Sequence, residues 1–345
     1  MAKDRIISRD SHPLDAPVEA ESSGVMRPSS LDYYIGQPEL KERLTIALDA
    51  ARQRSDPMEH TLLHGPPGLG KTTLAHIIAN EMGTRAYVTS GPALTKGGDL
   101  VGTLTRMQPG DILFIDEIHR LPAAVEEYVY PAMEDFKIDF TLDSGIHAKV
   151  ITYNLKPFTL IGATTRAGLL TGALRSRFGL SHRIDYYQQE ELVDIVARAL
   201  GRLGIEGVPT EAINEIARRS RGTPRIGLRL MRRVRDFAQV RHGGKLNPQV
   251  VMDALALEGV DDAGLDKLDR MYLSTLIRVY QGGPAGLEAI AATMGEDPGT
   301  LEDVVEPYLL QIGFMARTRQ GRQITPEGRS WLESTKKSDS GSIGI

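Results

Sequence analysis

The sequence predicts an α/β fold in which helices flank a parallel sheet, followed by a small all-α domain and a C-terminal winged helix. Strand and helix signals alternate between about residues 40 and 185, and the strand signals then stop as far as 258. From 259 onward, helices precede two short extended runs, which is the outline of a winged helix-turn-helix. We therefore divide the chain into a flexible tail (1–24), a large domain (25–185), a small helical domain (186–258), a winged helix (259–332) and a second flexible tail (333–345).

Composition excludes several classes of protein. The 345 residues are 41% hydrophobic and 25% charged, which is enough apolar material for a sizeable core. A net charge of −4 argues against a uniformly basic protein but permits local basic patches. The absence of cysteine excludes disulfide scaffolds, thiol catalysis and thiolate metal sites. The charged start of the chain is no secretory signal and no apolar run approaches a membrane span, so we expect a soluble cytoplasmic protein.

The large domain should begin with a helix and continue with short apolar strands. Leu40, Leu44 and Leu48 recur at helical spacing, and a second helix is predicted to start at Thr72. Four strands are predicted, at Thr61–His64, Ala86–Thr89, Asp111–Ile115 and Phe158–Gly162.

The rest of the chain shows helical periodicity until near its end. Three helix faces are predicted in the small domain, marked by Leu192, Ile195, Val196, Ala199 and Leu200, by Ile213, Ile216 and Ala217, and by Leu228, Leu230, Met231, Val234 and Phe237. The winged helix should contain a helix near Asp266–Tyr280, a Gly-Gly-Pro break and two shorter helices, the last at Thr300–Gln311. Two extended runs within Phe314–Thr325 follow, and we expect Trp331 to anchor the packing of the final helix.

A phosphate-binding loop lies between the first predicted strand and the second helix. Gly65–Thr72 reads Gly-Pro-Pro-Gly-Leu-Gly-Lys-Thr and fits the pattern G-x-x-x-x-G-K-[ST]. Glycines allow successive backbone N–H groups to turn toward phosphate oxygens, and the helix N-terminus favours negative charge. We expect Lys71 to reach the β- and γ-phosphates and the Thr72 hydroxyl to ligate Mg²⁺.

Two carboxylates end the third predicted strand, directly after the apolar run Ile112–Ile115. Asp116 would lie next to the magnesium ion, and Glu117 would orient or deprotonate the attacking water. A strand ending in two acids is a weak pattern alone, but it becomes informative when it follows a phosphate loop.

The order of these motifs resembles that of the AAA+ ATPases. The resemblance implies a polar sensor at the end of the next strand, Thr165 with Thr164 as the alternative, within FTLIGATTR (158–166). In Leu174–Gly179 it implies that Arg177 is an arginine finger reaching the nucleotide of a neighbouring subunit. Gly222-Thr223-Pro224-Arg225 resembles the second sensor, with Arg225 on the γ-phosphate.

Longer stretches resemble one AAA+ family in particular. GPPGLGKTTLA, LFIDEIHRL, EEYVYPAMEDF, FTLIGATTRAG, RGTPRI and RRVRDFAQV are similar to the RuvB family, bacterial motors that drive branch migration of Holliday junctions. The resemblance covers residues 26 to about 332 and departs only in the longer N-terminal tail. It implies an ATP- and Mg²⁺-dependent homohexamer that works with RuvA and RuvC in recombination, repair and the SOS response.

The resemblance also implies a nucleotide site drawn from several segments. Met26 and Arg27 would border the adenine, Tyr187 would contact the nucleotide from the small domain, and Glu134–Phe136 would lie near the subunit interface. The full set is Met26, Arg27, Tyr34, Ile35, Gly65, Pro67, Gly68, Gly70, Lys71, Thr72, Thr73, Glu134, Asp135, Phe136, Arg177, Tyr187, Pro224 and Arg225.

Two arginine-rich segments are candidates for binding DNA. Residues 198–241 carry eleven arginines and four acids, which we interpret mainly as a solvated helix face plus the sensor arginine. Arg317, Arg319 and Arg322 cluster around a glycine-containing turn with no nearby acid in the wing itself. Arginines on a hairpin tip suit contacts to backbone phosphates, which carry no sequence information. The family resemblance implies Arg317 and Arg322 as the DNA contacts.

The segment 137–155 is the candidate docking site for RuvA. Phe136–Leu142 and His147–Leu155 flank Asp143-Ser144-Gly145, which predicts a β-hairpin. The apolar side chains of Val150, Ile151, Tyr153 and Leu155 could form a docking patch, and packing into the core explains them equally well.

Two other classes of function fit the sequence less well. A AAA+ protein remodeller usually carries an aromatic pore loop after the second strand, and Lys96-Gly97-Gly98-Asp99-Leu100 has no aromatic residue. A winged-helix regulator could use ATP as a static switch, but the presence of Glu117 and Arg177 favours turnover. The spacing of the histidines, including His64 and His119, suggests packing or solvent exposure rather than a metal site.

Overall fold

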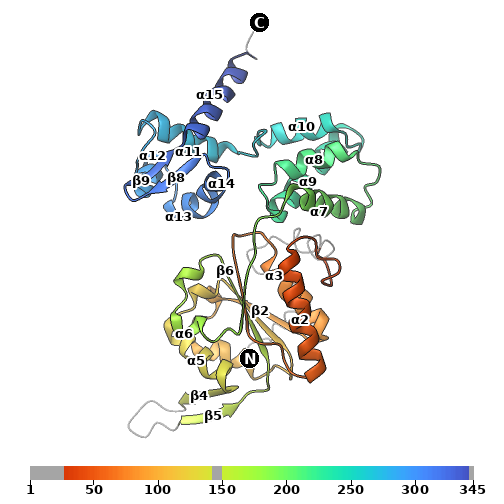
Figure 1. The fold of residues 1–345 in the computed structure, drawn as a ribbon, viewed down its shortest axis with the longest axis vertical. Coiled ribbons are helices and arrows are strands. Elements are labelled where there is room, and N and C mark those ends of the chain that lie inside the picture. The colour runs from red at the N-terminus through yellow and green to blue at the C-terminus, as the bar shows by residue number, and fades with distance from the viewer. Residues whose placement is uncertain (1–26, 142–149, 342–345) are drawn as a thin grey trace, which may run out of the picture. The chain divides into compact units, whose positions relative to one another are not determined.

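The computed structural model describes residues 27–141 and 150–341, with side chains described over 27–139 and 152–334. The chain forms two compact units (Figure 1). The first comprises the chain up to Glu206 together with Thr223–Arg225, and the second comprises Gly207–Gly222 together with the chain from Ile226 onward. The predicted fold class is confirmed: a parallel sheet with flanking helices, a helical region and a winged helix.

A five-stranded parallel sheet forms the centre of the first unit, in the order β2-β3-β6-β1-β7. Its strands are β1 (Thr61–His64), β2 (Ala86–Ser90), β3 (Ile112–Asp116), β6 (Thr159–Thr164) and β7 (Leu180–Arg183). The sequence predicted four of these to within two residues at each end and missed β7. Of the four residues of β7, His182 alone is buried, so the strand lacks an apolar run.

Both faces of the sheet pack against helices. Neighbouring side chains on a strand point to opposite faces, so each buried strand contributes to both packing layers. Leu113 and Ile115 share a core cluster with Leu100 of α4 and Val129 of α5, whereas Phe114 between them is buried on the other face. In Figure 1, α2 and α3 lie on one side of the sheet and α5 and α6 on the other. The helical elements that lie wholly in this unit are α2 (Pro38–Arg54), α3 (Lys71–Met82), η1 (Gly91–Ala93), α4 (Gly97–Leu104), η2 (Ile118–Arg120), α5 (Ala123–Glu134), η3 (Ala167–Leu169), α6 (Gly172–Arg175) and α7 (Gln189–Arg202).

The predicted hairpin is confirmed as a separate antiparallel pair, β4 (Lys137–Thr141) and β5 (Val150–Asn154). The predicted turn falls within 142–149, outside the described residues, as do the side chains of Val150 and Ile151. Of the proposed patch, Tyr153 is exposed and Leu155 is buried in the core. Packing therefore explains Leu155.

The second unit contains helices and the two-stranded wing. Its elements are α8 (Thr210–Arg218), α9 (Pro224–Arg241, whose first two residues belong to the first unit), α10 (Pro248–Leu257), α11 (Lys267–Arg278), α12 (Leu287–Met294), α13 (Pro298–Thr300), η4 (Leu301–Val305), α14 (Glu306–Gln311), β8 (Met315–Thr318), β9 (Gly321–Ile324) and α15 (Pro326–Gly341). A cluster of buried side chains that includes Tyr272, Leu276 and Leu309 forms the core of the winged helix.

The last helix confirms one expectation and corrects another. The Trp331 ring packs against Phe314 with centroids 5.4 Å apart, as an anchor should. However, α15 continues to Gly341, so residues 333–341 of the expected tail are helical. This segment lacks the apolar periodicity on which the prediction relied, but no proline or glycine interrupts it between Gly328 and Gly341.

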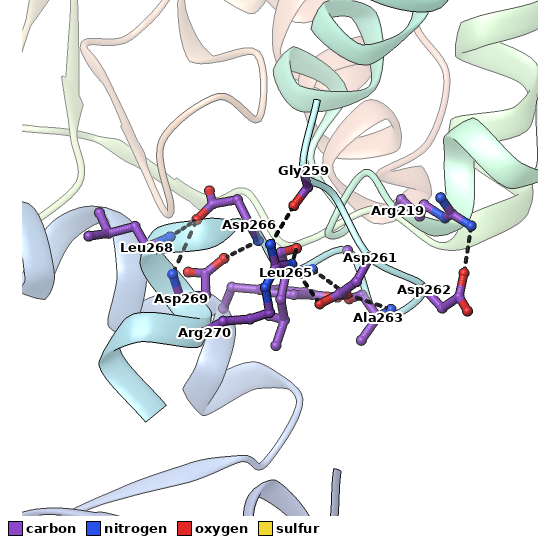
Figure 2. A network of polar contacts seen from close by, with 12 residues as sticks. Arg219, Gly259, Asp261, Asp262, Ala263, Leu265, Asp266, Leu268, Asp269 and Arg270 are labelled. Carbon is purple, nitrogen blue, oxygen red and sulfur yellow. Dashed lines mark hydrogen bonds and ion pairs between the residues drawn. The ribbon is translucent and has the colours of Figure 1, made fainter. Parts of the chain in front are cut away.

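A polar network in the second unit joins the turn after α8 to the start of α11 (Figure 2). Arg219 bonds to Asp262 at 2.6 Å. Arg221 has a left-handed backbone (φ 56°) and pairs with Asp269 at 2.5 Å and with Asp266 at 3.2 Å. Arg221 and Asp269 are both buried, and their ion pair joins the turn after α8 to the first turn of α11 in the winged helix.

Over the described part of the chain, each helix is too short or too polar to cross a lipid bilayer.

Candidate functional site

The loop between β1 and α3 has the backbone that a phosphate site requires. Gly65, Gly68 and Gly70 have φ values of 144°, 78° and 98°. A Cβ on Gly65 would lie 2.3 Å from the carbonyl oxygen of Ile184, so no side chain fits there. These glycines lead directly into the N-terminus of α3, where N–H groups and the helix dipole favour an anion.

Lys71 lies at the first position of α3 and is buried. Its ammonium donates to the carbonyl oxygens of Gly65 at 2.9 Å and Pro66 at 2.8 Å, which holds its charge inside the loop. Burial lowers the pKa of Lys71, Asp116 and Glu117 act in the opposite direction, and nearby Arg225 lowers it further. The cation and both acids predicted from the sequence therefore lie within electrostatic range of one another.

The two acids lie next to the end of β6, because β3 and β6 are adjacent and parallel and their carboxyl ends therefore share one edge of the sheet. Asp116 ends β3, and its Oδ1 accepts a hydrogen bond from the Glu117 amide at 2.9 Å. Glu117 is in the left-handed region (φ 48°), which is strained for a residue with a side chain. Its Oε2 lies 3.5 Å from the Thr165 hydroxyl.

Thr164 and Thr165 face different partners. Thr164 is buried, lies 2.8 Å from His119 Nδ1 and accepts a hydrogen bond from the Arg166 amide at 3.0 Å. His119 Nδ1 is in turn 3.4 Å from Glu117 Oε2. Thr165 is thus the threonine whose hydroxyl meets Glu117. The sequence predicted packing or solvent exposure for His119, and the spacing of the histidines gave no sign of this contact.

The oxygen atoms at this edge suit a hard divalent cation. Thr72, in the first turn of α3, and Asp116, at the end of β3, are both half-buried and offer a hydroxyl and a carboxylate. The described residues contain no cluster of three or more His, Asp or Glu that could hold a metal by themselves. Mg²⁺ usually takes one or two protein ligands plus phosphate oxygens and water, so this donor set fits Mg²⁺ bound with a nucleotide.

Two tyrosines close the other side of the loop. The hydroxyls of Tyr34 and Tyr187 lie 2.7 Å apart, and that of Tyr187 is 3.3 Å from the Leu69 carbonyl oxygen. Both side chains are buried, and burial raises the pKa of Tyr34 to about 12 and raises the pKa of Tyr187 further. Both therefore stay neutral and keep their hydroxyl protons at any physiological pH.

The remaining N-terminal residues predicted at the nucleotide have different environments. Ile35 is half-buried beside Tyr34, and Arg27 is exposed, with its carbonyl accepting a hydrogen bond from Arg202 at 3.1 Å. Met26 lies outside the described residues.

The segment Thr223–Arg225 approaches the phosphate loop at Gly68. The Arg225 amide lies 3.3 Å from the Gly68 carbonyl oxygen that accepts its hydrogen bond. A Cβ on Gly68 would lie 2.8 Å from Thr223 Cγ2, so glycine is required for this approach. Pro224 is the first residue of α9, and the side chain of Arg225, which follows it, is exposed.

Arg177 is held by its own chain. Its guanidinium donates to the Ala173 carbonyl at 2.6 Å, pairs with Glu134 at 3.0 Å and lies 4.3 Å from the centre of the Tyr130 ring. The sequence did not predict this contact between Arg177 and Glu134. That both lie near a subunit interface stays a prediction.

Glu134, Asp135 and Phe136 do not share one environment. Glu134 and Asp135 are exposed, whereas the Phe136 ring packs against those of His60 and Phe158 at 6.1 and 5.8 Å between centroids. The Phe136 side chain is therefore part of the core packing.

The wing holds the three predicted DNA-contacting arginines. Arg317 on β8 and Arg322 on β9 are opposite each other, and Arg319 is exposed at the tip. Both opposed arginines pair with Glu306, a fully buried residue that was not among the site residues predicted from the sequence. A carboxylate eleven residues before Arg317 gave no local sign of lying beneath it.

Comparison with known proteins identifies the family. Three family models match successive parts of the chain: the Holliday junction DNA helicase RuvB P-loop domain over residues 26–184, the RuvB AAA lid domain over 187–261, and the RuvB C-terminal winged helix domain over 262–333.

Individual relatives agree with these models. The Holliday junction branch migration complex subunit RuvB of Desulfosudis oleivorans is 57% identical over 300 residues, 87% of each chain. That of Chlorobium phaeobacteroides is 54% identical over 313 residues, 91% of this chain and 90% of the relative. A solved structure of the Thermotoga maritima RuvB branch migration motor is 49% identical, with a TM-score of 0.81, and covers 90% of this chain and 98% of that one. The chain belongs to the RuvB family.

Proposed function

We propose that this protein is an ATP-driven DNA motor that moves Holliday junctions by branch migration together with RuvA. The observation that carries the proposal is the meeting of Lys71, Asp116, Glu117 and Thr165 around one glycine-rich loop. This set supplies a phosphate-binding cation, a metal-binding carboxylate and a base or water-orienting carboxylate, which are the parts that hydrolysis of a nucleoside triphosphate needs.

Each residue has a role in turnover. Lys71 and the loop amides bind the β- and γ-phosphates, and Glu117 orients the attacking water, with Thr165 holding the carboxylate. Arg225 follows the backbone contact to Gly68 and would reach the γ-phosphate. Thr72 and Asp116 would hold Mg²⁺, which would supply charge neutralisation on the phosphate oxygens.

The active form is a homohexameric ring, because Arg177 acts on the nucleotide of a neighbour. A finger supplied in trans can contribute roughly 10³–10⁵ in rate. The contacts to Glu134 and Tyr130 support a resting position from which the half-buried Arg177 side chain would turn to the neighbour.

The winged helix binds duplex DNA through its backbone. Arg317, Arg319 and Arg322 suit phosphates, which a motor moving along any sequence needs to contact. The segment 96–100 supports a DNA motor over a protein unfoldase, since its apolar residue, Leu100, is buried in the core instead of being available as a pore residue.

The hairpin 137–155 is the proposed RuvA contact, with the exposed Tyr153 as its described apolar residue. Cooperation with RuvC, a cytoplasmic location and a part in recombination, repair and the SOS response follow from the family as further proposals.

The test uses a synthetic four-way DNA junction with ATP and Mg²⁺, with and without RuvA. Conversion to duplex products is expected with the wild-type chain and should be lost with Lys71→Ala. ATPase activity without junction conversion, in the presence of RuvA, would reject the motor and leave an ATPase with another substrate.

A further inference from the structure

The wing places two like charges directly opposite each other. Arg317 on β8 and Arg322 on β9 are register partners in the antiparallel pair, so both side chains are on the same face. Like charges in this position normally destabilise a hairpin. Some neighbouring group must therefore compensate them.

Glu306, at the start of α14, provides that compensation from beneath the wing. Its side chain has no exposed surface. Arg317 reaches its Oε2 through Nε at 2.7 Å and Nη2 at 2.5 Å, and Arg322 reaches its Oε1 through Nε at 3.0 Å. The Tyr272 hydroxyl of α11 donates to Oε1 at 2.8 Å. One buried carboxylate thus fixes side chains from β8, β9 and α11.

The arrangement orients the two arginines while cancelling their charge. Glu302 Oε1 lies 3.9 Å from Arg317 and 3.8 Å from Arg322, so two guanidinium groups face two carboxylates. The side chains are nevertheless 41% and 19% exposed, so part of each guanidinium reaches solvent. Among the described residues Arg319 forms no ion pair, and it carries its full charge at the tip.

We propose that Glu306 is a positioning residue for DNA binding. It holds Arg317 and Arg322 in one orientation, so that they bind backbone phosphates as prearranged donors, while Arg319 supplies free positive charge. This inference rests on the proposed function, because it concerns the same contact with DNA. Prearrangement matters because ordering a long side chain on binding costs free energy.

Two substitutions with the same change in charge separate positioning from simple electrostatics. Glu306→Gln and Glu302→Gln each remove one carboxylate beside the same two arginines. The measurement is the affinity of the full chain for a fluorescently labelled duplex at several salt concentrations.

We expect Glu302→Gln to bind DNA as tightly as the wild type or more tightly. Glu306→Gln should bind about 5- to 30-fold more weakly, although it makes the net charge one unit more positive. This factor corresponds to a cost of about 0.5–1 kcal/mol for re-ordering each of the two released arginines on binding. If the two variants shift affinity in the same direction, Glu306 acts only through its charge and the proposal is wrong.

Folding is checked with the single tryptophan, Trp331, which lies in the same winged helix. If Glu306→Gln loses the native Trp331 emission, Tyr272→Phe replaces it, because this change removes one hydrogen bond to Glu306 and leaves all charges in place. A smaller loss of affinity is then expected, and unchanged binding by folded Tyr272→Phe would overturn the proposal.

Arg319→Ala distinguishes failure of this inference from failure of the proposed DNA contact. It should reduce the slope of log affinity against log salt by about 1. If it does so while Glu306→Gln binds normally, the wing binds DNA without the positioning role. If neither Arg319→Ala nor Glu306→Gln alters binding, the wing is not the DNA surface and the proposed contact fails as well.

Discussion

Lys71 and Glu117 differ in what they contact, and their removal should separate binding from turnover. Lys71→Ala removes the cation inside the loop, so we expect both nucleotide affinity and hydrolysis to fall to background. Glu117→Gln keeps the size of the side chain and its contact with Thr165, so ATP should still bind while turnover is lost. Equilibrium binding of a fluorescent ATP analogue and phosphate release measure the two effects. A Glu117→Gln protein that fails to bind ATP would contradict the role given to Glu117.

The hydroxyl pair of Tyr34 and Tyr187 offers a second test on single residues. Tyr187→Phe leaves the buried Tyr34 hydroxyl without its 2.7 Å partner, which should cost about 1–3 kcal/mol of stability. The double change with Tyr34→Phe removes both polar groups and should recover part of that loss. Calorimetric unfolding of the wild type, Tyr187→Phe and the double variant gives the comparison. Equal stability of the single and double variants would mean that the pair contributes little.

Among the structural elements, the turn between α8 and α9 contains a buried ion pair, Arg221–Asp269. Arg221→Met leaves Asp269 buried without its cation, and we expect about 3–5 kcal/mol of destabilisation at neutral pH. Burial raises the pKa of Asp269 to about 6 in the folded protein. Folding is therefore favoured by the protonated carboxyl. Because Arg221 lowers the pKa of Asp269, its removal raises that pKa further, so the penalty should shrink as the pH is lowered toward about 6.

Urea unfolding followed by Trp331 fluorescence measures this penalty in the relevant unit. Arg270→Met is the matched control, because its partner Asp261 keeps hydrogen bonds from the Ala263 and Leu265 amides at 2.9 Å each. It should cost clearly less than Arg221→Met. A penalty for Arg221→Met that is the same at every pH would argue against an unpaired Asp269 as its cause.

Elements defined by local patterns could be predicted from the sequence, and those that depend on distant contacts could not. The strand–loop–helix around Gly65–Thr72 needs glycines, a lysine and an apolar run that are adjacent in the chain. β7 instead exists because Leu180–Arg183 pairs in register with β1, more than a hundred residues away in the chain. Its sequence carries no alternation strong enough to signal this pairing.

In the candidate site, too, local motifs could be predicted and contacts between distant residues could not. The phosphate loop and the two acids could be predicted because the residues of each motif are adjacent in the sequence. The contacts of His119 with Thr164 and of Glu306 with the wing were not, because each joins residues from separate elements through side-chain geometry. For the finger, the sequence pointed to Arg177 but not to its pairing with Glu134 and Tyr130 in the same subunit.

At the scale of the whole assembly, the proposed finger predicts a non-linear effect of mixing subunits. An Arg177→Ala subunit would prevent hydrolysis of the nucleotide bound by its neighbour, while its own nucleotide site stays intact. Rings assembled from mixtures with the wild type should therefore lose more junction-stimulated ATPase activity than the wild-type fraction alone accounts for. A strictly proportional decline would place Arg177 in its own subunit's reaction. Lys71→Ala mixtures provide the comparison for a defect confined to one site.

The division of the chain into two units restricts how the protein can be cut or recombined. The backbone passes from one unit to the other after Glu206, Gly222 and Arg225. Thr223–Arg225, which contact Gly68 of the phosphate loop, therefore lie in the sequence between two segments of the second unit. A fragment ending at Glu206 lacks the segment that packs on Gly68, and one ending at Arg225 carries α8 without its packing partner α10. A chimaera of two relatives would have to exchange residues 207–222 together with everything from 226 onward, leaving Thr223–Arg225 with the parent that supplies the phosphate loop.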